Sequence, residues 1–246
     1  MNNLLLMGIG AQRTGSTSMF RYLKEHPDLE PPKRKETYYY AYNYWHGEDW
    51  YNAMFTPDAY SFEFCTYYIY YPLAPQRIVV DYPDMKFLLL LRDPVDRAIS
   101  QYFHEIDVGE LDAAVGIEEL MDGELEHWPE YVQGVMQREY SHEHDHKCIL
   151  ARGRYAEQLK RWQGFFDSEQ IFVAEVCGKT EGETRRTVNE IFRWIGLCPY
   201  DDWEYKAHYT LDYLQVSQAT RERLRAYYKP HNEELFELLG RRFDWQ

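Results

Sequence analysis

The chain has 246 residues, long enough for one large α/β domain with a sizeable core, and we expect residues 1–246 to form a single domain. Lysine and arginine total 27 against 41 for aspartate and glutamate, and the resulting formal net charge of −14 argues against a general nucleic-acid binder. The longest apolar run near the N-terminus is too short to span a membrane and leads directly into a glycine-containing stretch. We therefore expect neither a membrane span nor a signal peptide.

The first predicted strand, residues 4–10, continues into the stretch GIGAQRTGSTS. Gly10 and Gly15 have the separation found in the phosphate-binding Walker A loop, G-x-x-x-x-G-K-[ST], and Thr17 stands at the Ser/Thr position. Ser16 replaces the lysine of that motif, and Arg13 is the one cation in the loop.

A helix is predicted directly after this loop, because apolar side chains recur at helical spacing until Pro27 ends the pattern. Backbone N–H groups at the start of a helix are unpaired, and the helix dipole is positive there. The sequence therefore predicts an anion site in the loop rather than an ordinary turn between a strand and a helix.

A second apolar strand, residues 86–92, ends at Arg92 and precedes a helix that has a proline in its first turn and Asp93 as its expected N-cap. Arg92 and Ser100 together suit a second phosphate, because the guanidinium offers a planar fork of donors. The alternative is a structural ion pair between Arg92 and Asp93 or Asp96. Two anion sites would suit a ligand with two separated phosphates.

The remaining predicted elements alternate in the manner of an α/β protein. A third strand covers residues 170–176, and helices are expected at 154–166, at 184–196 and, in two pieces broken at Pro230, at 218–243. Apolar strands that alternate with helices indicate a parallel sheet covered on both faces. Ligands of such sheets bind beyond the carboxyl ends of the strands, which is where both predicted anion sites fall.

Five stretches of the sequence resemble the PAPS-dependent sulfotransferases, most closely their heparan-sulfate-type and bacterial carbohydrate branch. In chain order these are GAQRTGSTSMFRYLKEHP, KETYYYAYNYWHGEDWY, LLLLRDPVDRAISQYF, GRYAEQLKRWQGFF and YYKPHNEELFELLGRRFDW. The resemblance runs from residue 8 to the end, with a poorly matched middle at about residues 105–150. It implies a P-loop-NTPase-like fold and an enzyme that transfers a sulfuryl group from 3′-phosphoadenosine 5′-phosphosulfate (PAPS) to a hydroxyl acceptor, leaving PAP, without requiring a metal.

The resemblance also implies roles for individual residues. Arg13 occupies the position of the family's loop lysine and is assigned to the leaving group. The 5′-phosphate is assigned to the loop around it, and the 3′-phosphate to the second motif and to a degenerate basic loop near the C-terminus. The implied cofactor-binding residues are Gln12, Arg13, Thr14, Gly15, Ser16, Thr17, Arg92, Ser100, Lys206 and His208.

The base that deprotonates the acceptor has two candidates. Glu36 matches the family's glutamate in the K-E-x-x-[FY]-[FY] stretch, although one glutamate in a charged segment is usually solvated. His104 lies one helical turn beyond Ser100, and a histidine suits proton transfer near neutral pH, although it more often packs in the helix. The sequence leaves this choice open.

The acceptor cleft is less clear in the sequence. Tyrosine-rich stretches at residues 37–45 and 65–71 predict either aromatic packing over the sheet or a platform for a sugar or a phenol. Lys33, Arg34 and Lys35 form a basic patch, but the net charge of −14 argues against heavily sulfated heparan as the acceptor. A Glu-Lys pair of the family reads Glu63-Phe64 here.

The stretch SHEHDHKC places His142, His144 and His146 at alternate positions. We expect a solvated loop, with a transition-metal site on one face of an extended segment as the alternative. The four cysteines are scattered without a C-x-x-C pair and predict reduced thiols and a cytoplasmic protein: Cys65, Cys148, Cys177 and Cys198.

The leading interpretation is a sulfotransferase. The alternatives are an ATP-using P-loop kinase of a small molecule and a non-catalytic nucleotide- or glycan-binding protein. The missing Walker lysine and the pair Arg92 and Ser100 argue against the kinase. The acceptor, beyond a glycan or a phenol, and the oligomeric state stay open.

Overall fold

The structure is a computed structural model that describes residues 3–176, 178–206 and 216–245. Its contacts divide the chain into two compact units. The first is drawn from residues 1–91 and 162–209, and the second from residues 92–161 and 210–246. Each unit is described by itself below.

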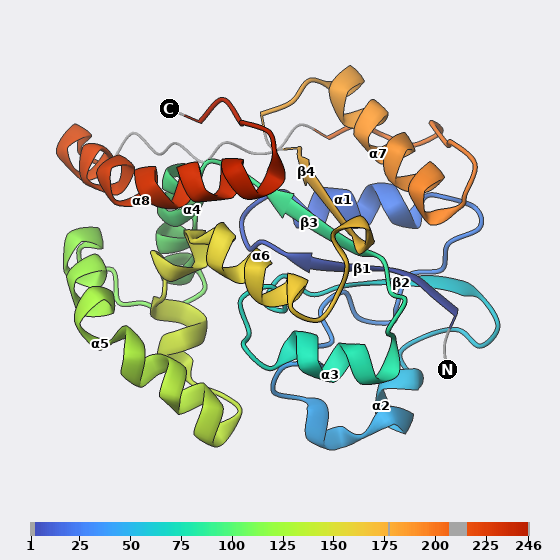
Figure 1. The fold of residues 1–246 in the computed structure, drawn as a ribbon, viewed down its shortest axis with the longest axis horizontal. Coiled ribbons are helices and arrows are strands. Elements are labelled where there is room, and N and C mark those ends of the chain that lie inside the picture. The colour runs from blue at the N-terminus through green and yellow to red at the C-terminus, as the bar shows by residue number, and fades with distance from the viewer. Residues whose placement is uncertain (1–2, 177, 207–215, 246) are drawn as a thin grey trace. The chain divides into compact units, whose positions relative to one another are not determined.

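The elements alternate along the chain as Figure 1 labels them. The strands are β1 (Asn3–Gly10), β2 (Tyr60–Phe64), β3 (Phe87–Leu91) and β4 (Ile171–Glu175). The α-helices are α1 (Ser16–Lys24), α2 (Glu48–Asn52), α3 (Ala74–Asp81), α4 (Pro94–Asp107), α5 (Ile117–Arg138), α6 (Tyr155–Gln163), α7 (Glu181–Ile195) and α8 (Gln218–Leu239). Short 3-10 helices lie at η1 (Tyr44–His46), η3 (Ala151–Gly153) and η4 (Ser168–Gln170), and a π-helical turn at η2 (Glu143–Lys147).

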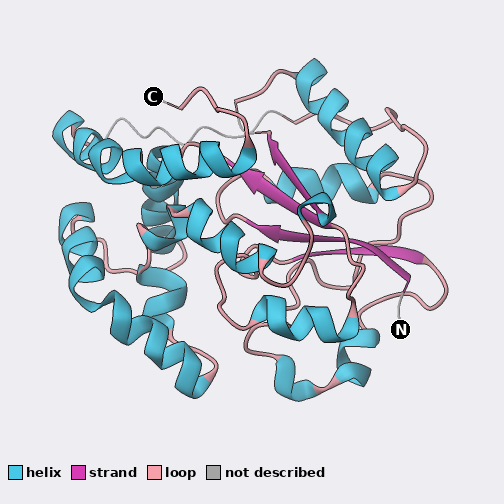
Figure 2. Cartoon of the chain, in the orientation of Figure 1, coloured by secondary structure: helices cyan, strands magenta, loops and turns pink. Residues whose placement is uncertain are grey.

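The first unit contains a parallel sheet in the order β2-β1-β3-β4. On one face, α1 and α7 pack over alternate strand residues such as Leu88 and Leu90. On the other face, the ring of Phe87 meets Trp162 at 5.0 Å and Phe166 at 4.5 Å between centroids. Helices therefore cover both faces (Figures 1 and 2), as the sequence predicts for a parallel sheet.

The predicted strands are confirmed with small changes at their ends. β3 ends at Leu91, so Arg92 is the first residue after the strand rather than its last. Asp93 caps α4 as expected, because its Oδ1 accepts a hydrogen bond from the N–H of Val95 at 2.8 Å. The carboxyl edge of the sheet is thus followed by the glycine loop after β1 and by Arg92 after β3.

The second unit is helical. Its core joins α4, α5 and α8 through buried side chains that include Ile99, Leu120, Ile149 and Leu224. Burying one such side chain contributes about 1.5–3 kcal/mol, and packing of this kind supplies most of the stability of helices in a folded protein.

Two sequence expectations are wrong in this unit. α8 continues through Pro230 without a break, because side chains on both sides of the proline, such as Tyr228 and Phe236, are buried and hold the helix together. The histidine stretch is a π-helical turn with His144 buried rather than a solvated loop.

Among the described residues, no helix is both long enough and apolar enough to cross a membrane.

Candidate active site

The glycine loop connects the end of β1 to the start of α1 as the sequence predicts. Gly15 is the N-cap of α1 and has φ +94°, a left-handed conformation that favours glycine. It offers no side chain to the first N–H groups of the helix, and the first turn carries no acidic residue. The positive end of the helix dipole therefore lies at the glycine loop, where it favours an anion.

The side chains of this loop differ in their surroundings. The Thr14 hydroxyl is buried and donates to the carbonyl of Ala11 at 2.6 Å, which holds the loop closed on itself. Arg13 is half-buried and has φ +66°, and Gln12 is half-buried beside it. Thr17 is exposed in the first turn of α1. The described loop thus offers a cation and a hydroxyl close to the helix N-terminus.

A second cation lies at the loop, from a segment that follows α1 in the chain. The Nζ of Lys35 donates to Oγ of Ser16 at 3.4 Å and to Oε1 of Glu36 at 2.8 Å. Both side chains are about one-fifth exposed, at 23% for Lys35 and 20% for Glu36. An ammonium group thus reaches the residue that stands where the Walker lysine would be.

Glu36 is fixed from its other side by the end of β2. Its Oε2 accepts hydrogen bonds from the N–H of Thr66 at 3.3 Å and from Oγ1 of Thr66 at 3.2 Å. Lys35 and Thr66 therefore hold the two carboxylate oxygens separately, and both contacts lie at the carboxyl edge of the sheet.

A buried carboxylate supports the segment that carries Glu36. Glu63 on β2 is fully buried and accepts hydrogen bonds from the hydroxyls of Thr37, Tyr51 at 2.5 Å and Tyr68 at 2.9 Å. Burial raises the pKa of Glu63 above its usual range, although these hydroxyls act to lower it. Because Thr37 directly follows Glu36, this cluster restrains the backbone of the candidate base.

The tyrosine-rich stretches provide both buried packing and partly exposed rings. Most of their rings are buried, among them Tyr39, Tyr40 and Tyr68. Tyr38 and Tyr42 are half-buried and stack at 4.9 Å with an interplanar angle of 16°. This stacked pair begins two residues after Glu36 in the chain and offers partly exposed aromatic surface.

The second predicted phosphate motif lies in the second unit. Arg92 Nη2 is 3.7 Å from Oδ2 of Asp96, and the carbonyl of Arg92 accepts a hydrogen bond from the Tyr155 hydroxyl at 3.1 Å. Ser100 is buried on α4. The predicted ion pair with Asp96 is therefore present, and it holds the guanidinium of Arg92 near the start of the helix.

The three remaining predicted site residues are His104, Lys206 and His208. His104 is half-buried on α4. Lys206 Nζ pairs with Glu204 at 3.0 Å, and the carbonyl of Lys206 accepts a hydrogen bond from the Tyr22 hydroxyl at 3.1 Å. His208 lies outside the described residues.

Comparison with known proteins assigns this arrangement to a family. The sequence model of the sulfotransferase domain matches residues 4–224, which is most of the chain. The chain belongs to the sulfotransferase family. Its α/β fold is that of a solved member of this family.

That solved structure is a sulfotransferase from Alicyclobacillus acidocaldarius, which superposes with a TM-score of 0.77 at 25% identity over 99% of this chain and 97% of that one. Among curated relatives, the bifunctional heparan sulfate N-deacetylase/N-sulfotransferase 4 of Mus musculus is 26% identical over 95% of this chain and 29% of its own length. The membrane-associated sulfotransferase kil1 of Dictyostelium discoideum is 23% identical over 97% of this chain and 65% of its own. The chain thus spans less than two thirds of either curated relative.

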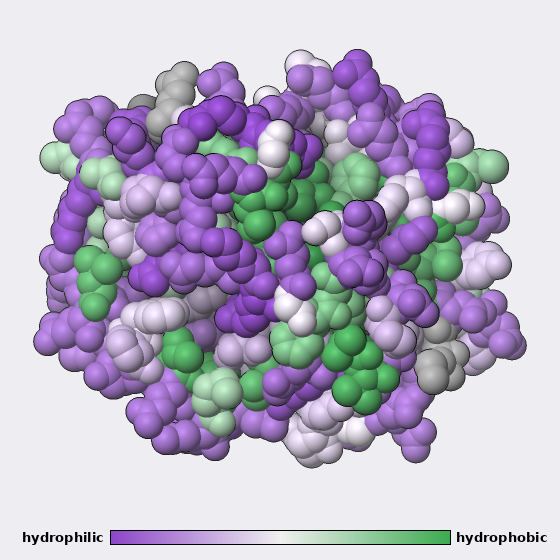
Figure 3. Space-filling model, viewed as in Figure 1, coloured by the Kyte–Doolittle hydropathy of each residue, from purple (hydrophilic) through white to green (hydrophobic). Residues whose placement is uncertain are grey.

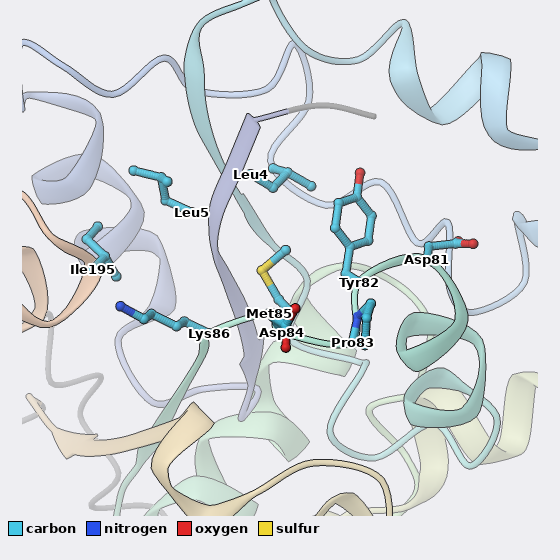
Figure 4. Close-up of a pocket in the computed structure, with 9 residues that line it drawn as sticks. All are labelled: Leu4, Leu5, Asp81, Tyr82, Pro83, Asp84, Met85, Lys86 and Ile195. Carbon is cyan, nitrogen blue, oxygen red and sulfur yellow. The ribbon is translucent and has the colours of Figure 1, made fainter.

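The sulfotransferase also has a pocket at the opposite edge of its sheet, where β1 and β3 begin. Its volume is about 330 Å³. The lining residues are Leu4, Leu5, Asp81, Tyr82, Pro83, Asp84, Met85, Lys86 and Ile195 (Figure 4). Because the glycine loop follows the carboxyl end of β1, this pocket is separate from the candidate active site.

Lys35 is the functional candidate that sequence reasoning placed only in a general basic patch. Its position directly before the matched glutamate in K-E-T places it next to the candidate base in the chain but does not indicate its contact with Ser16. The sequence presents Glu63 only as a departure from the family pattern, and its place between Phe62 and Phe64, directly before a tyrosine-rich stretch, indicates a buried, hydrogen-bonded carboxylate.

Proposed function

We propose that this sulfotransferase uses PAPS as its donor and transfers the sulfuryl group to a hydroxyl acceptor, with Glu36 as the general base. The observation that carries the proposal is that Lys35 donates hydrogen bonds to both Ser16, at the N-terminus of α1, and Glu36. It joins an anion site, a cation and a base within one small region.

The chemistry follows from the charges. In-line transfer of a sulfuryl group leaves negative charge on the phosphate that departs, and fixed positive groups lower the barrier by stabilising that charge. The N–H groups of α1, Lys35 and Arg13 would supply this stabilisation. Glu36 would accept the proton of the acceptor hydroxyl as its oxygen approaches the sulfur.

The acceptor class is inferred from the aromatic surface and the overall charge. The stacked rings of Tyr38 and Tyr42 suit a flat or ring-shaped acceptor, which is a carbohydrate or a phenol. The relative from Mus musculus is named for heparan sulfate. The net charge of −14 favours an acceptor with little negative charge of its own. The face drawn in Figure 3 is largely hydrophilic. A cytoplasmic location remains a prediction.

The donor can be tested by ligand-induced stabilisation. We expect PAP to raise the melting temperature of the protein clearly and ATP with magnesium to raise it weakly, because the loop lacks the Walker lysine. The measurement is a thermal-shift titration with both ligands at matched concentrations. A larger shift with ATP and magnesium, removed by EDTA, would support the P-loop kinase instead.

Arg92 is proposed to bind the 3′-phosphate of the donor. We expect Arg92→Ala to weaken PAP binding about ten- to hundredfold, the scale of one charged hydrogen bond. The check is the Kd for PAP by calorimetry, with Arg242→Ala as a control because Arg242 is exposed and pairs with Glu233 at 2.7 Å. Unchanged affinity for PAP in Arg92→Ala would mean that Arg92 does not bind the donor and only forms a structural ion pair with Asp96.

A further inference from the structure

The π-helical turn η2 brings together three metal-binding side chains in the second unit. Glu110, His142 and His146 each offer one ligand atom, and these atoms lie within 4.8 Å of one another. Nε2 of His142 is already 3.0 Å from Oε2 of Glu110, and the rings of His142 and His146 are 4.8 Å apart. The turn therefore aligns two imidazoles, four residues apart in the chain, with a carboxylate from the segment after α4.

A buried carboxylate orients one of these imidazoles. Oε2 of Glu105 lies 2.8 Å from Nδ1 of His146, and Glu105 is only 1% exposed. A carboxylate accepts hydrogen bonds, so Nδ1 of His146 is the donor, and in the neutral ring the lone pair lies on Nε2, which is 3.7 Å from Oδ2 of Asp145. Histidines that bind metals are typically held in this way by a second carboxylate behind the ring.

Buried side chains hold the backbone of the turn in place. His144 is buried, and Arg152 donates to the carboxylate of Asp145 at 2.7 Å. Arg152 is also nearly fully buried. Because the backbone between His142 and His146 is held by these contacts, the two candidate ligands keep their spacing before any ion arrives.

We propose that Glu110, His142 and His146 bind a divalent transition metal, with zinc the best match. Two imidazoles and one carboxylate are a zinc ligand set that leaves a fourth position for water. Ligand atoms around tetrahedral zinc lie about 3.4 Å apart, given bonds of about 2.0–2.1 Å. The ligand atoms of Glu110 and His142 are already 3.0 Å apart, so these two side chains have to move toward His146. They can do so because they are 41% and 40% exposed.

The surrounding residues indicate a binding site rather than a hydrolytic one. The stretch His142-Glu143-His144-Asp145-His146 matches the H-E-x-x-H pattern of zinc hydrolases, in which the glutamate is the general base. Here Glu143 accepts a hydrogen bond from Oγ of Ser141 at 3.3 Å and pairs with Lys147 at 3.6 Å. The carboxylate of Glu143 is thus held by Ser141 and Lys147 rather than serving as a general base. The ion would instead link the turn to the segment after α4.

The site is tested by titrating the full chain, freed of metal with EDTA and exchanged into buffer, with zinc chloride alone. We expect one equivalent of zinc to bind, and we expect His142→Ala, His146→Ala and Glu110→Ala each to weaken its binding at least tenfold. Glu105→Gln should weaken it about ten- to hundredfold. The matched control is His127→Ala, because His127 is a half-exposed histidine of α5 in the same unit, 3.8 Å from Glu126.

Cobalt(II) supplies a second readout that is independent of folding stability. We expect visible bands typical of tetrahedral nitrogen and oxygen ligands, lost in His142→Ala while the far-ultraviolet circular dichroism is kept. Failure of the unaltered chain to bind either ion, or equal binding in His142→Ala and His127→Ala, would overturn the proposal. Thiolate-to-cobalt absorption would assign the ion to a cysteine and would overturn it as well.

Discussion

Replacing Glu36 with glutamine is expected to lower the turnover of sulfuryl transfer by about a hundredfold or more, the scale of a lost general base. Glutamine keeps the shape of the side chain, and its amide oxygen can still accept the hydrogen bonds that Thr66 donates, although the contact with Lys35 is lost. It cannot take a proton from the acceptor. The melting temperature and the affinity for PAP should therefore stay close to those of the unaltered chain, while kcat falls with a defined acceptor.

His104→Ala is the decisive comparison, because His104 is the rival base. The structure places Glu36 in contact with Lys35, which also bonds Ser16 of the glycine loop, whereas His104 is half-buried on α4. We therefore expect His104→Ala to keep most of the turnover. Full activity of Glu36→Gln together with an inactive His104→Ala would transfer the role of base to the histidine. Full activity of both would favour an acceptor that ionises unaided, such as a phenol.

The sheet and its phosphate loop were predictable because each rests on a local signal. Continuous apolar runs gave β1, β3 and β4, and Gly10 and Gly15 with the helix after them gave the loop. Asp93 before Pro94 marked the start of α4, because this pair has both a capping side chain and a fixed φ.

The errors and omissions have physical causes in contacts between distant residues. β2 contains Glu63, a charged residue that argues against a buried strand until its three hydroxyl partners are known. α5 contains Pro129, which argues against one continuous helix although its apolar side chains recur at helical spacing. Pro230 did not break α8, because the buried Tyr228 and Phe236 outweigh one lost backbone hydrogen bond.

The candidate site was predictable in part. Glu36 was assigned through its match to a family motif, and the structure adds the contacts that fix it. Lys35 could not be assigned to the loop from the sequence, because nineteen residues separate it from Ser16 and only the fold brings them together. Charged segments such as Lys33 to Lys35 are usually solvated, so their composition alone does not identify the one side chain that turns inward.

Lys35→Ala is expected to lower turnover by about a hundred- to a thousandfold, the scale of one lost group that stabilises charge in the transition state. The family's loop lysine is replaced here by Arg13, whose planar guanidinium is less able than an ammonium to follow an oxygen as its charge grows. Lys35 reaches Ser16 and so supplies a mobile ammonium at the same place. Because PAP lacks the sulfuryl group, its affinity should fall much less than kcat, and kcat and the Kd for PAP are measured together.

Lys33→Ala separates this local effect from a change in net charge. Lys33 belongs to the same basic patch, but its Nζ donates to the carbonyl of Ala53 at 2.7 Å rather than to the glycine loop. Removing it changes the charge of the chain by the same amount and should leave turnover nearly unaltered. Equal losses in the two variants would mean that the patch acts only through its overall field, and no loss in either would leave Arg13 as the cation on the leaving group. A selective loss in Lys35→Ala, with an unchanged melting temperature, would show that this chain provides its loop lysine from a different segment.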